Sequence, residues 1–416
     1  MNTQLSNSKK MLTLAGTVLT QFALGSVYTW SLFNSPLADK LGDPISQVAF
    51  SFGILSLALA VASSLSGKLQ ERFGVRNVTI GAGLLLGGSL VLTSHASSLW
   101  MLYLFAGLLV GYADGTGYLM TLTNCVKLFP KNKGLASACA IGAYGLGSLG
   151  FKFINVYLLS HFGLSQTFNL WGGIAMVMVI VGGLMMTDAP KQEATSADNQ
   201  QATTDNKVFD YTLPQAIKTS QFWMLAVMFL TVCMSGLYVI GVAKDVGQNY
   251  VHLSAETAAS AVAIIAVANL LGRLVLGIMS DRIARTRVIA LALVVCFVGV
   301  ASLVFLHLNS LSFYFAVACI AFSFGGTITV YPSLVSDFFG LNNVTKNYGV
   351  IYLGFGVGSF AGSIVASLFG GFVATFYLML ALIVVSIVMA VTIKLPGAPK
   401  DSTSHARQSN VAVQQN

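Results

Sequence analysis

Charged side chains are scarce in this chain of 416 residues, where Asp, Glu, Lys and Arg together make up 9%. Soluble globular domains carry roughly 25% charged residues, so the scarcity argues against a water-soluble fold. Hydrophobic residues make up 55% of the chain, and 41 positions are Gly. Helices that pack in lipid use small residues at their contacts and apolar residues elsewhere. The composition therefore predicts an all-α integral membrane protein.

Patterns that bind metals or form disulfide frameworks are also missing from the sequence. The five cysteines lie inside apolar runs, with no CxxC pair and no Cys/His spacing. Residues 145–150 satisfy the G-x-G-x-x-G dinucleotide pattern, but they lie in an apolar run rather than after a strand. We expect no metal and no cofactor, and we interpret these glycines as helix-packing positions.

Twelve apolar runs are long enough for membrane helices, since a bilayer core of about 30 Å needs roughly 20 residues per helix. They begin near residues 11, 46, 75, 98, 134, 165, 221, 256, 287, 311, 344 and 371. The polar stretch 188–220 divides them six and six, which predicts a cytoplasmic linker between an N-terminal bundle over 1–187 and a C-terminal bundle over 221–395. The polar tail over 396–416 is expected to be disordered and cytoplasmic.

Basic residues gather in the loops on one side of the predicted membrane, and Lys and Arg mark cytoplasmic loops. Both termini are therefore expected in the cytoplasm. This distribution accounts for the net charge of +8 without a nucleic-acid partner. Two basic residues, Lys152 and Arg273, fall inside predicted spans.

The two halves of the sequence repeat each other at an offset of about 210 residues, as in transporters built from duplicated bundles. GKLQER at 67–72 matches GIMSDR at 277–282, so each loop carries an acid followed by an arginine. Two further matches are Asp114 with Phe324 and Tyr144 with Phe355. Six spans per half give both copies the same orientation, which predicts two pseudo-symmetric bundles with a cavity between them.

The loop from Gly67 to Arg76 resembles a motif of the major facilitator superfamily, whose members have twelve helices and a central polar linker. Short motifs narrow the resemblance to the oxalate/formate antiporter family: Tyr28–Trp30, Lys127–Pro130, Lys133–Gly134, Ala143–Gly147, Arg273 with Ser280–Asp281, Ser336–Gly340 and Asn347–Gly349. The resemblance covers essentially the whole chain. It implies a carrier of small carboxylates in the inner membrane of a bacterium, and we expect it to act as a monomer.

Ionisable residues inside spans are functional candidates, because an unpaired ion in a bilayer core is costly. Arg273 lies on the predicted eighth span with Asn269 one turn before it on the same face, and a guanidinium matches a carboxylate bidentately. The resemblance assigns the substrate-binding arginine of the family to this position. The alternative is that Arg273, only about 12 Å before Asp281, joins the charges of the cytoplasmic loop.

The resemblance also implies that this chain departs from the family at one substrate-binding position. The second cation of the family is a lysine on the eleventh span, and the matching residue here is Phe355. A compact dicarboxylate is best held by two cations, so a single cation favours a monocarboxylate such as pyruvate. Lys152 on the fifth span is a candidate replacement, although it lies roughly 12 Å further toward the periplasm than Tyr144, the repeat mate of Phe355. With Lys152 as second cation, oxalate/formate-type exchange stays open.

Asp114 on the fourth span is the third ionisable group in the predicted spans. Its repeat mate Phe324 matches a family aromatic that lines the substrate site, so we expect Asp114 to face the same cavity. It could couple transport to protons, or it could form a static ion pair with Lys152 that neutralises both side chains.

Aromatic residues are expected to enclose the substrate, because phenol hydroxyls can donate to carboxylate oxygens and rings exclude water. By the resemblance, the aromatics that match positions around the ligand are Tyr28, Tyr118, Tyr144, Phe324, Tyr352 and Phe355. For any one of them, helix packing alone is the other interpretation, since aromatic residues are common in membrane spans.

These observations predict a secondary carrier that works by alternating access, with Arg273 holding a carboxylate between two halves that rock around it. The predicted gating residues are Glu71, Arg72 and Arg76 on one half, and Asp281 and Arg282 on the other. They would latch the inward-closed state. A membrane enzyme is disfavoured, because no catalytic constellation converges. A membrane sensor that binds the acid without moving it is the alternative from another class.

Overall fold

Helices account for all the regular secondary structure of the described residues. The computed structural model describes residues 6–190, 209–369 and 372–397. The N-terminal half contains α1 (Asn7–Leu24), the 3-10 helix η1 (Gly25–Phe33), α2 (Asn34–Leu41), α3 (Ile45–Ser94), α4 (Leu99–Leu102), the π-helix η2 (Tyr103–Leu109), α5 (Val110–Leu128) and α6 (Lys133–Met185). The C-terminal half contains α7 (Leu213–Ala216), α8 (Ser220–Asp245), the π-helix η5 (Val246–Tyr250), α9 (Ala255–Met279), α10 (Arg285–Phe305), α11 (Ser310–Phe339), α12 (Val344–Ile351), α13 (Leu353–Phe369) and α14 (Phe372–Thr392). The predicted all-α architecture is confirmed.

Eight helical segments of the described chain are long and apolar enough to cross a membrane. Two of them, α3 with 50 residues and α6 with 53 residues, are each long enough to cross twice. A shorter apolar stretch, Ala263–Met279, belongs to α9, and the predicted eleventh span is divided between α12 and α13. The count of twelve spans and the cytoplasmic location of the termini stay predictions.

Glycines in left-handed conformations break the two longest helices at the positions where new spans were predicted to start. Gly74 has a φ of 76° and Gly163 a φ of 72°, a region that glycine adopts without steric penalty. After the first break, both carboxylate oxygens of Asp188 accept from the backbone N–H of Val75 at 3.0 Å. This carboxylate satisfies a donor that the start of a helix leaves free.

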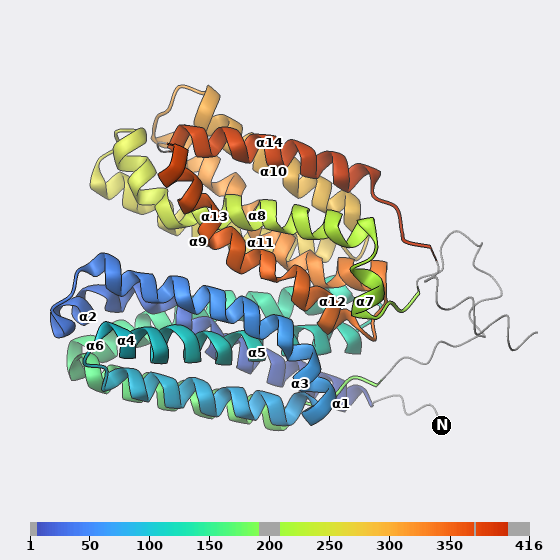
Figure 1. The fold of residues 1–416 in the computed structure, drawn as a ribbon, viewed down its shortest axis with the longest axis horizontal. Coiled ribbons are helices and arrows are strands. Elements are labelled where there is room, and N and C mark those ends of the chain that lie inside the picture. Colours follow the sequence, from blue (N-terminus) through green and yellow to red (C-terminus); the bar gives the residue numbers. More distant parts are fainter. Residues whose placement is uncertain (1–5, 191–208, 370–371, 398–416) are drawn as a thin grey trace, which may run out of the picture.

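Two helical bundles form the molecule, with α1 to α6 in the lower bundle and α8 to α14 in the upper bundle of Figure 1. Within them, α3 packs on α5 and α6, and α9 packs on α11. Across them, α3 contacts α12 and α13, while α6 contacts α9 and α11. The start of α1, the break in α3 and the end of α14 lie at one end of the molecule (Figure 1), which we call the predicted cytoplasmic end.

The domain boundaries proposed from the sequence are compatible with this arrangement but stay predictions. Most of the linker prediction, over 191–208, and the tail prediction from 398 onward lie outside the described residues.

Candidate functional site

A small cavity lies between the two bundles, with a volume of about 20 Å³, which is room for roughly one water molecule. Its walls come from both halves of the chain. The residues that line it are Tyr28, Leu59, Tyr118, Ile141, Tyr144, Arg273, Phe324, Ile328, Tyr352 and Phe355. The structure thus brings together Arg273 and every aromatic residue that the sequence placed around a ligand.

The aromatic rings form a continuous chain from one half to the other. Tyr144 makes edge contacts with Tyr28 and Tyr118 at ring-centroid distances of 5.3 and 5.2 Å. Tyr118 meets Tyr352 across the halves at 5.5 Å, and Tyr352 stacks on Phe355 at 5.2 Å. Aromatic pairs attract each other at such separations. A ligand larger than water must therefore turn some of these rings aside when it enters.

Arg273 reaches from α9 into the cavity and is 8% exposed. Its Nε donates to Asn269 Oδ1 at 2.8 Å, and its Nη1 donates to the backbone carbonyl of Ile141 on α6 at 2.6 Å. No acidic residue of the described chain forms an ion pair with it. These bonds use two of the five N–H donors of an arginine, and no other hydrogen bond of the guanidinium is formed within the described residues, which leaves donors for a ligand.

Two neighbours fix the position of the guanidinium. Asn269 does not line the cavity but orients Arg273 from one turn before it, as the spacing predicted. A Cβ atom on Gly145 would lie 3.2 Å from Arg273 Nη1, so glycine leaves the space that the guanidinium needs. Arg273 therefore points into the cavity and does not join the charges near Asp281.

Asp114 lies behind the cavity wall rather than in it. The residue is fully buried, and the Tyr144 hydroxyl donates to its Oδ2 at 2.8 Å. Its Oδ1 has no hydrogen-bond partner within the described part of the chain. Asp114 was expected to face the same cavity; it is not among the residues that line it, but it accepts from Tyr144, which does line it.

Lys152 is not brought to the cavity. Its side chain is exposed on α6, and no ion pair connects it to Asp114 among the described residues. It lies eight residues after Tyr144, about 12 Å along the helix. Of the cationic side chains in the described ranges, Arg273 alone lines the cavity.

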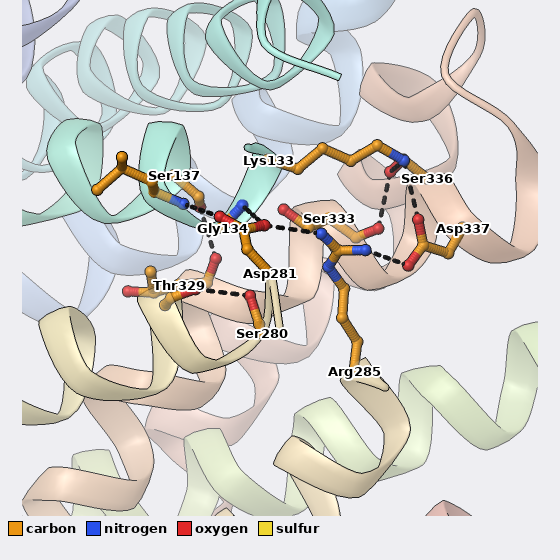
Figure 2. A network of polar contacts seen from close by, with 12 residues as sticks. Lys133, Gly134, Ser137, Ser280, Asp281, Arg285, Thr329, Ser333, Ser336 and Asp337 are labelled. Atoms are coloured by element: carbon orange, nitrogen blue, oxygen red, sulfur yellow. Dashed lines mark hydrogen bonds and ion pairs between the residues drawn. The ribbon is translucent and has the colours of Figure 1, made fainter. Parts of the chain in front are cut away.

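A partly buried cluster of charges joins the halves at the predicted cytoplasmic end, and Figure 2 shows its members. Asp281, in the turn between α9 and α10, accepts from the backbone N–H groups of Gly134 and Leu135 at 2.7 and 2.8 Å. These amides begin α6 on the other half, where a helix N-terminus leaves donors free and attracts anions. We call Asp281, Arg285, Asp337 and Lys133 the Asp281 cluster.

The rest of the Asp281 cluster links one charge to the next. Arg285 Nη2 donates to Asp281 at 3.0 Å, and its Nη1 donates to Asp337 at 2.5 Å. Lys133 Nζ, from the N-terminal half, pairs with the other oxygen of Asp337 at 2.8 Å and donates to Ser336 at 3.0 Å (Figure 2). Nearby, Ser137 Oγ donates to the carbonyl of Thr329 at 2.5 Å. The halves are thus held together at this end.

The repeat mate of Asp281 also reaches the opposite half. Glu71 on α3 pairs with Lys346 on α12 at 2.6 Å. The hydroxyls of Thr123 and Thr345 meet beside it at 2.8 Å. Unlike the Asp281 cluster, this pair is open to solvent, because the Glu71 side chain is 55% exposed.

The three arginines predicted for gating take other positions. Arg72 lies over the ring of Phe73, with its Cζ 5.2 Å from the ring centroid. Arg76 and Arg282 are exposed, and neither forms an ion pair within the described ranges. Arg285, the first residue of α10, pairs with Asp281 in place of Arg282.

Several functional candidates escaped the sequence analysis. Leu59, Ile141 and Ile328 line the cavity, but an apolar residue in an apolar span carries no signal. Lys133 and Asp337 could have been found, since these two residues have opposite charges and lie in loops that were predicted on the same side of the membrane. That signal would have suggested an ion pair between the halves.

Comparisons with known proteins place the chain among membrane transporters. Residues 13–351 match the family model described as Major Facilitator Superfamily, and residues 238–415 give a second match. The chain is 62% identical over 352 residues to the "Uncharacterized MFS-type transporter YhjX" of Escherichia coli (strain K12), covering 84% of this chain and 86% of that protein. It is 27% identical over 356 residues to the "Oxalate:formate antiporter" of Oxalobacter formigenes, covering 83% and 79% of the two chains.

A solved structure with a similar fold is that of the proton:xylose symporter XylE bound to 6-bromo-6-deoxy-D-glucose. The TM-score is 0.71, with 94% of this chain and 97% of the other covered, at 14% sequence identity. At that identity the likeness concerns the fold alone.

Proposed function

Because the chain belongs to the major facilitator superfamily, and is thus a multi-pass membrane transporter rather than an enzyme, we propose that it carries a small monocarboxylate such as pyruvate. Transport proceeds by alternating access, with the two bundles rocking around the cavity. The membrane is the inner membrane of a bacterium, and the working unit is a monomer.

The observation that carries this proposal is the free side of Arg273. A buried guanidinium without an acidic partner is unfavourable unless something else satisfies it, and here two protein bonds leave donors directed at a cavity between the halves. A carboxylate supplies the matching charge and geometry. The hydroxyls of Tyr28, Tyr118 and Tyr352 can donate to its oxygens and to a neighbouring carbonyl, whereas the Tyr144 hydroxyl donates to Asp114.

The number of cations in the cavity supports a monocarboxylate over a dicarboxylate. Phe355 stacks on Tyr352 at the position where the resemblance to the oxalate/formate antiporter family implies a lysine, and Lys152 is exposed elsewhere on α6. A second carboxylate of oxalate would face these rings without a partner charge, which costs free energy in a buried site. A methyl group, as in pyruvate, suits the same rings.

Asp114 is the candidate for proton coupling. An ionised Asp114 would lack a counter-ion in the described chain, whereas the neutral carboxyl needs none. The Tyr144 hydroxyl, which lines the cavity, donates to Asp114. A change in the protonation of Asp114 would therefore alter a hydrogen bond in the cavity wall.

Carboxylate exchange of the oxalate:formate kind is the second candidate, and the relative in Oxalobacter formigenes bears that name. A sensor that binds the acid without moving it is a third, and it would bind substrate yet show no counterflow.

Uptake into proteoliposomes tests the proposal. We expect labelled pyruvate to accumulate above equilibrium when an acid-outside pH gradient is imposed, and oxalate to enter poorly. Uptake that ignores the gradient but rises with pyruvate or formate inside would favour exchange. Binding without any uptake in folded protein would favour the sensor.

The variant Asp114→Asn separates the coupling step from transport. Gradient-driven accumulation should be lost while pyruvate exchange survives, because the amide cannot carry a proton. Asp39→Asn is the matched control, since Asp39 is exposed on α2. Undiminished accumulation by Asp114→Asn would remove Asp114 from the mechanism, and Asp114→Glu, which keeps the carboxyl, shows whether a loss reflects chemistry or folding.

A further inference from the structure

A second hollow lies on the N-terminal half, away from the substrate cavity. It is a groove of about 280 Å³ between the first two turns of α5 and the segments of α3 on either side of the break at Gly74. Phe73, Gly81 and Leu85 are among the residues that line it, and its exposed lining is mostly apolar. In a membrane-spanning bundle such a surface faces hydrocarbon, so the groove is shaped for an apolar chain.

The length of the groove fits one leaflet of the membrane. Its lining runs along α3 from Asn77, just after the break at Gly74, to Leu85. Eight residues of helix span about 12 Å, and half of a bilayer core is about 15 Å. The groove therefore begins at the predicted cytoplasmic end and reaches toward the middle of the bilayer.

Basic residues lie next to lining residues at the predicted cytoplasmic end of the groove, which we call its mouth. The Arg72 guanidinium lies over the ring of Phe73, which forms part of the groove wall. Arg76, directly before the lining residue Asn77, is exposed, and so is Lys68 one turn before Arg72.

The acidic residues nearby already have partners. Glu71 is paired with Lys346, and Asp188 accepts from the amide of Val75 and from Gln70. The arginines at the mouth form no ion pair with any described residue, so they are available to an external anion.

We propose that this groove binds an anionic phospholipid, with one acyl chain in the groove and the phosphate at Arg72 and Arg76. An apolar slot that opens beside unpaired arginines, on the side where anionic lipids attract basic residues, matches both parts of such a molecule. Because Glu71 lies next to Arg72, an occupied groove also places the lipid beside the Glu71–Lys346 contact between the halves. The lipid site does not depend on the identity of the transported substrate.

Thermal unfolding of the purified full chain in detergent tests the proposal. We compare added phosphatidylglycerol with phosphatidylcholine of the same acyl chains. Phosphatidylglycerol should raise the melting temperature more, and each of Arg72→Gln and Arg76→Gln should weaken its apparent affinity about fivefold, which corresponds to about 1 kcal/mol per basic residue near an anionic surface.

Two glycine variants separate the groove from general lipid effects. A Cβ atom on Gly81 or on Gly88 meets no atom within 4 Å, so both positions accept a larger side chain. Gly81→Phe fills the groove and should abolish the preference for phosphatidylglycerol, whereas Gly88→Phe, two turns further along α3, should keep it.

Two results would contradict the lipid site. Equal stabilisation by both lipids in the unmodified protein would overturn the anionic site. A retained preference in Gly81→Phe would place the lipid elsewhere. If Gly81→Phe melts at a much lower temperature without lipid, Gly81→Leu serves in its place.

Discussion

Glu71 and Asp281 occupy the same position in two copies of one loop motif, and both contact the opposite half of the molecule. Asp281 accepts two backbone amides at the start of α6 and shares Arg285 with Asp337, and its side chain is 13% exposed. Glu71 pairs with Lys346 alone among the described residues, and its side chain is 55% exposed. The sequence repeat is therefore symmetric while the contacts between the halves are not.

This difference indicates that the two contacts contribute unequally to closure of the predicted cytoplasmic end. Buried, hydrogen-bonded charges lose much free energy when one partner is removed, whereas exposed ion pairs contribute about 1 kcal/mol or less. We infer that the Asp281 cluster is the main latch and that the Glu71–Lys346 pair adds little to it.

Asp281→Asn should cause the largest increase in the population of molecules that are open at the predicted cytoplasmic end. The amide keeps the size of the side chain but loses the charge that two backbone N–H groups and Arg285 share. Removing one partner of a fully buried charge network costs about 3 kcal/mol; because the Asp281 side chain is 13% exposed, we expect a loss of up to about this size, or up to roughly a hundredfold in the equilibrium. Distances between spin labels at the exposed positions Lys131 and Arg287 should then show a much larger open population.

The matched control is Arg282→Gln, which changes the neighbouring, exposed charge. We expect distances close to those of the unmodified protein. If Arg282→Gln opens the molecule as much as Asp281→Asn, the loss of either charge in this loop is sufficient, and the specific contacts of Asp281 are not what holds the halves together.

A double-mutant cycle on Lys133 and Asp337 should give an intermediate effect. The two side chains meet at 2.8 Å and are 12% and 30% exposed, so their coupling should be about 1 kcal/mol, a roughly fivefold change in the open population. The same label distances measured in Lys133→Ala, Asp337→Ala and the double variant give the coupling. A coupling near zero would show that Asp337 acts through Arg285 alone.

Glu71→Gln should have the smallest effect. An exposed pair contributes about 0.2–1 kcal/mol, and at 1 M salt the screening length falls to about 3 Å. The open population should thus rise less than about fivefold at low salt and should match that of the unmodified protein at high salt. An effect as large as that of Asp281→Asn would make the two latches equivalent.

The sequence predicted the helices well, because each apolar run is bounded by residues whose preferences are local. Runs predicted near 75 and 165 begin at Gly74 and Gly163, where a left-handed φ requires glycine. The family resemblance read from short motifs is confirmed by the family match and by the relatives. Local patterns of this kind are readable without knowing which segments meet in space.

Site residues could be predicted from the sequence only where the helical spacing and the family resemblance indicated the same positions. Arg273 with Asn269 and the aromatic residues of the cavity were found in this way. Lys152 was misplaced, because its depth in the membrane and its direction on α6 depend on packing rather than on spacing. The amides of Gly134 and Leu135 were missed, because a backbone donor has no signature in a sequence until the helix that begins there is placed against Asp281.

The most direct test of the central claim is the dissociation constant of pyruvate for the purified protein and for Arg273→Lys, with thermal unfolding as the check of folding. Lysine keeps the charge but not the planar fork of donors, and hydrogen bonds to charged groups contribute about 1.5–3 kcal/mol. We predict binding at least about tenfold weaker in Arg273→Lys at an unchanged melting temperature. Equal affinity in the two folded proteins would contradict the account, because Arg273 would then not be the group that holds the carboxylate.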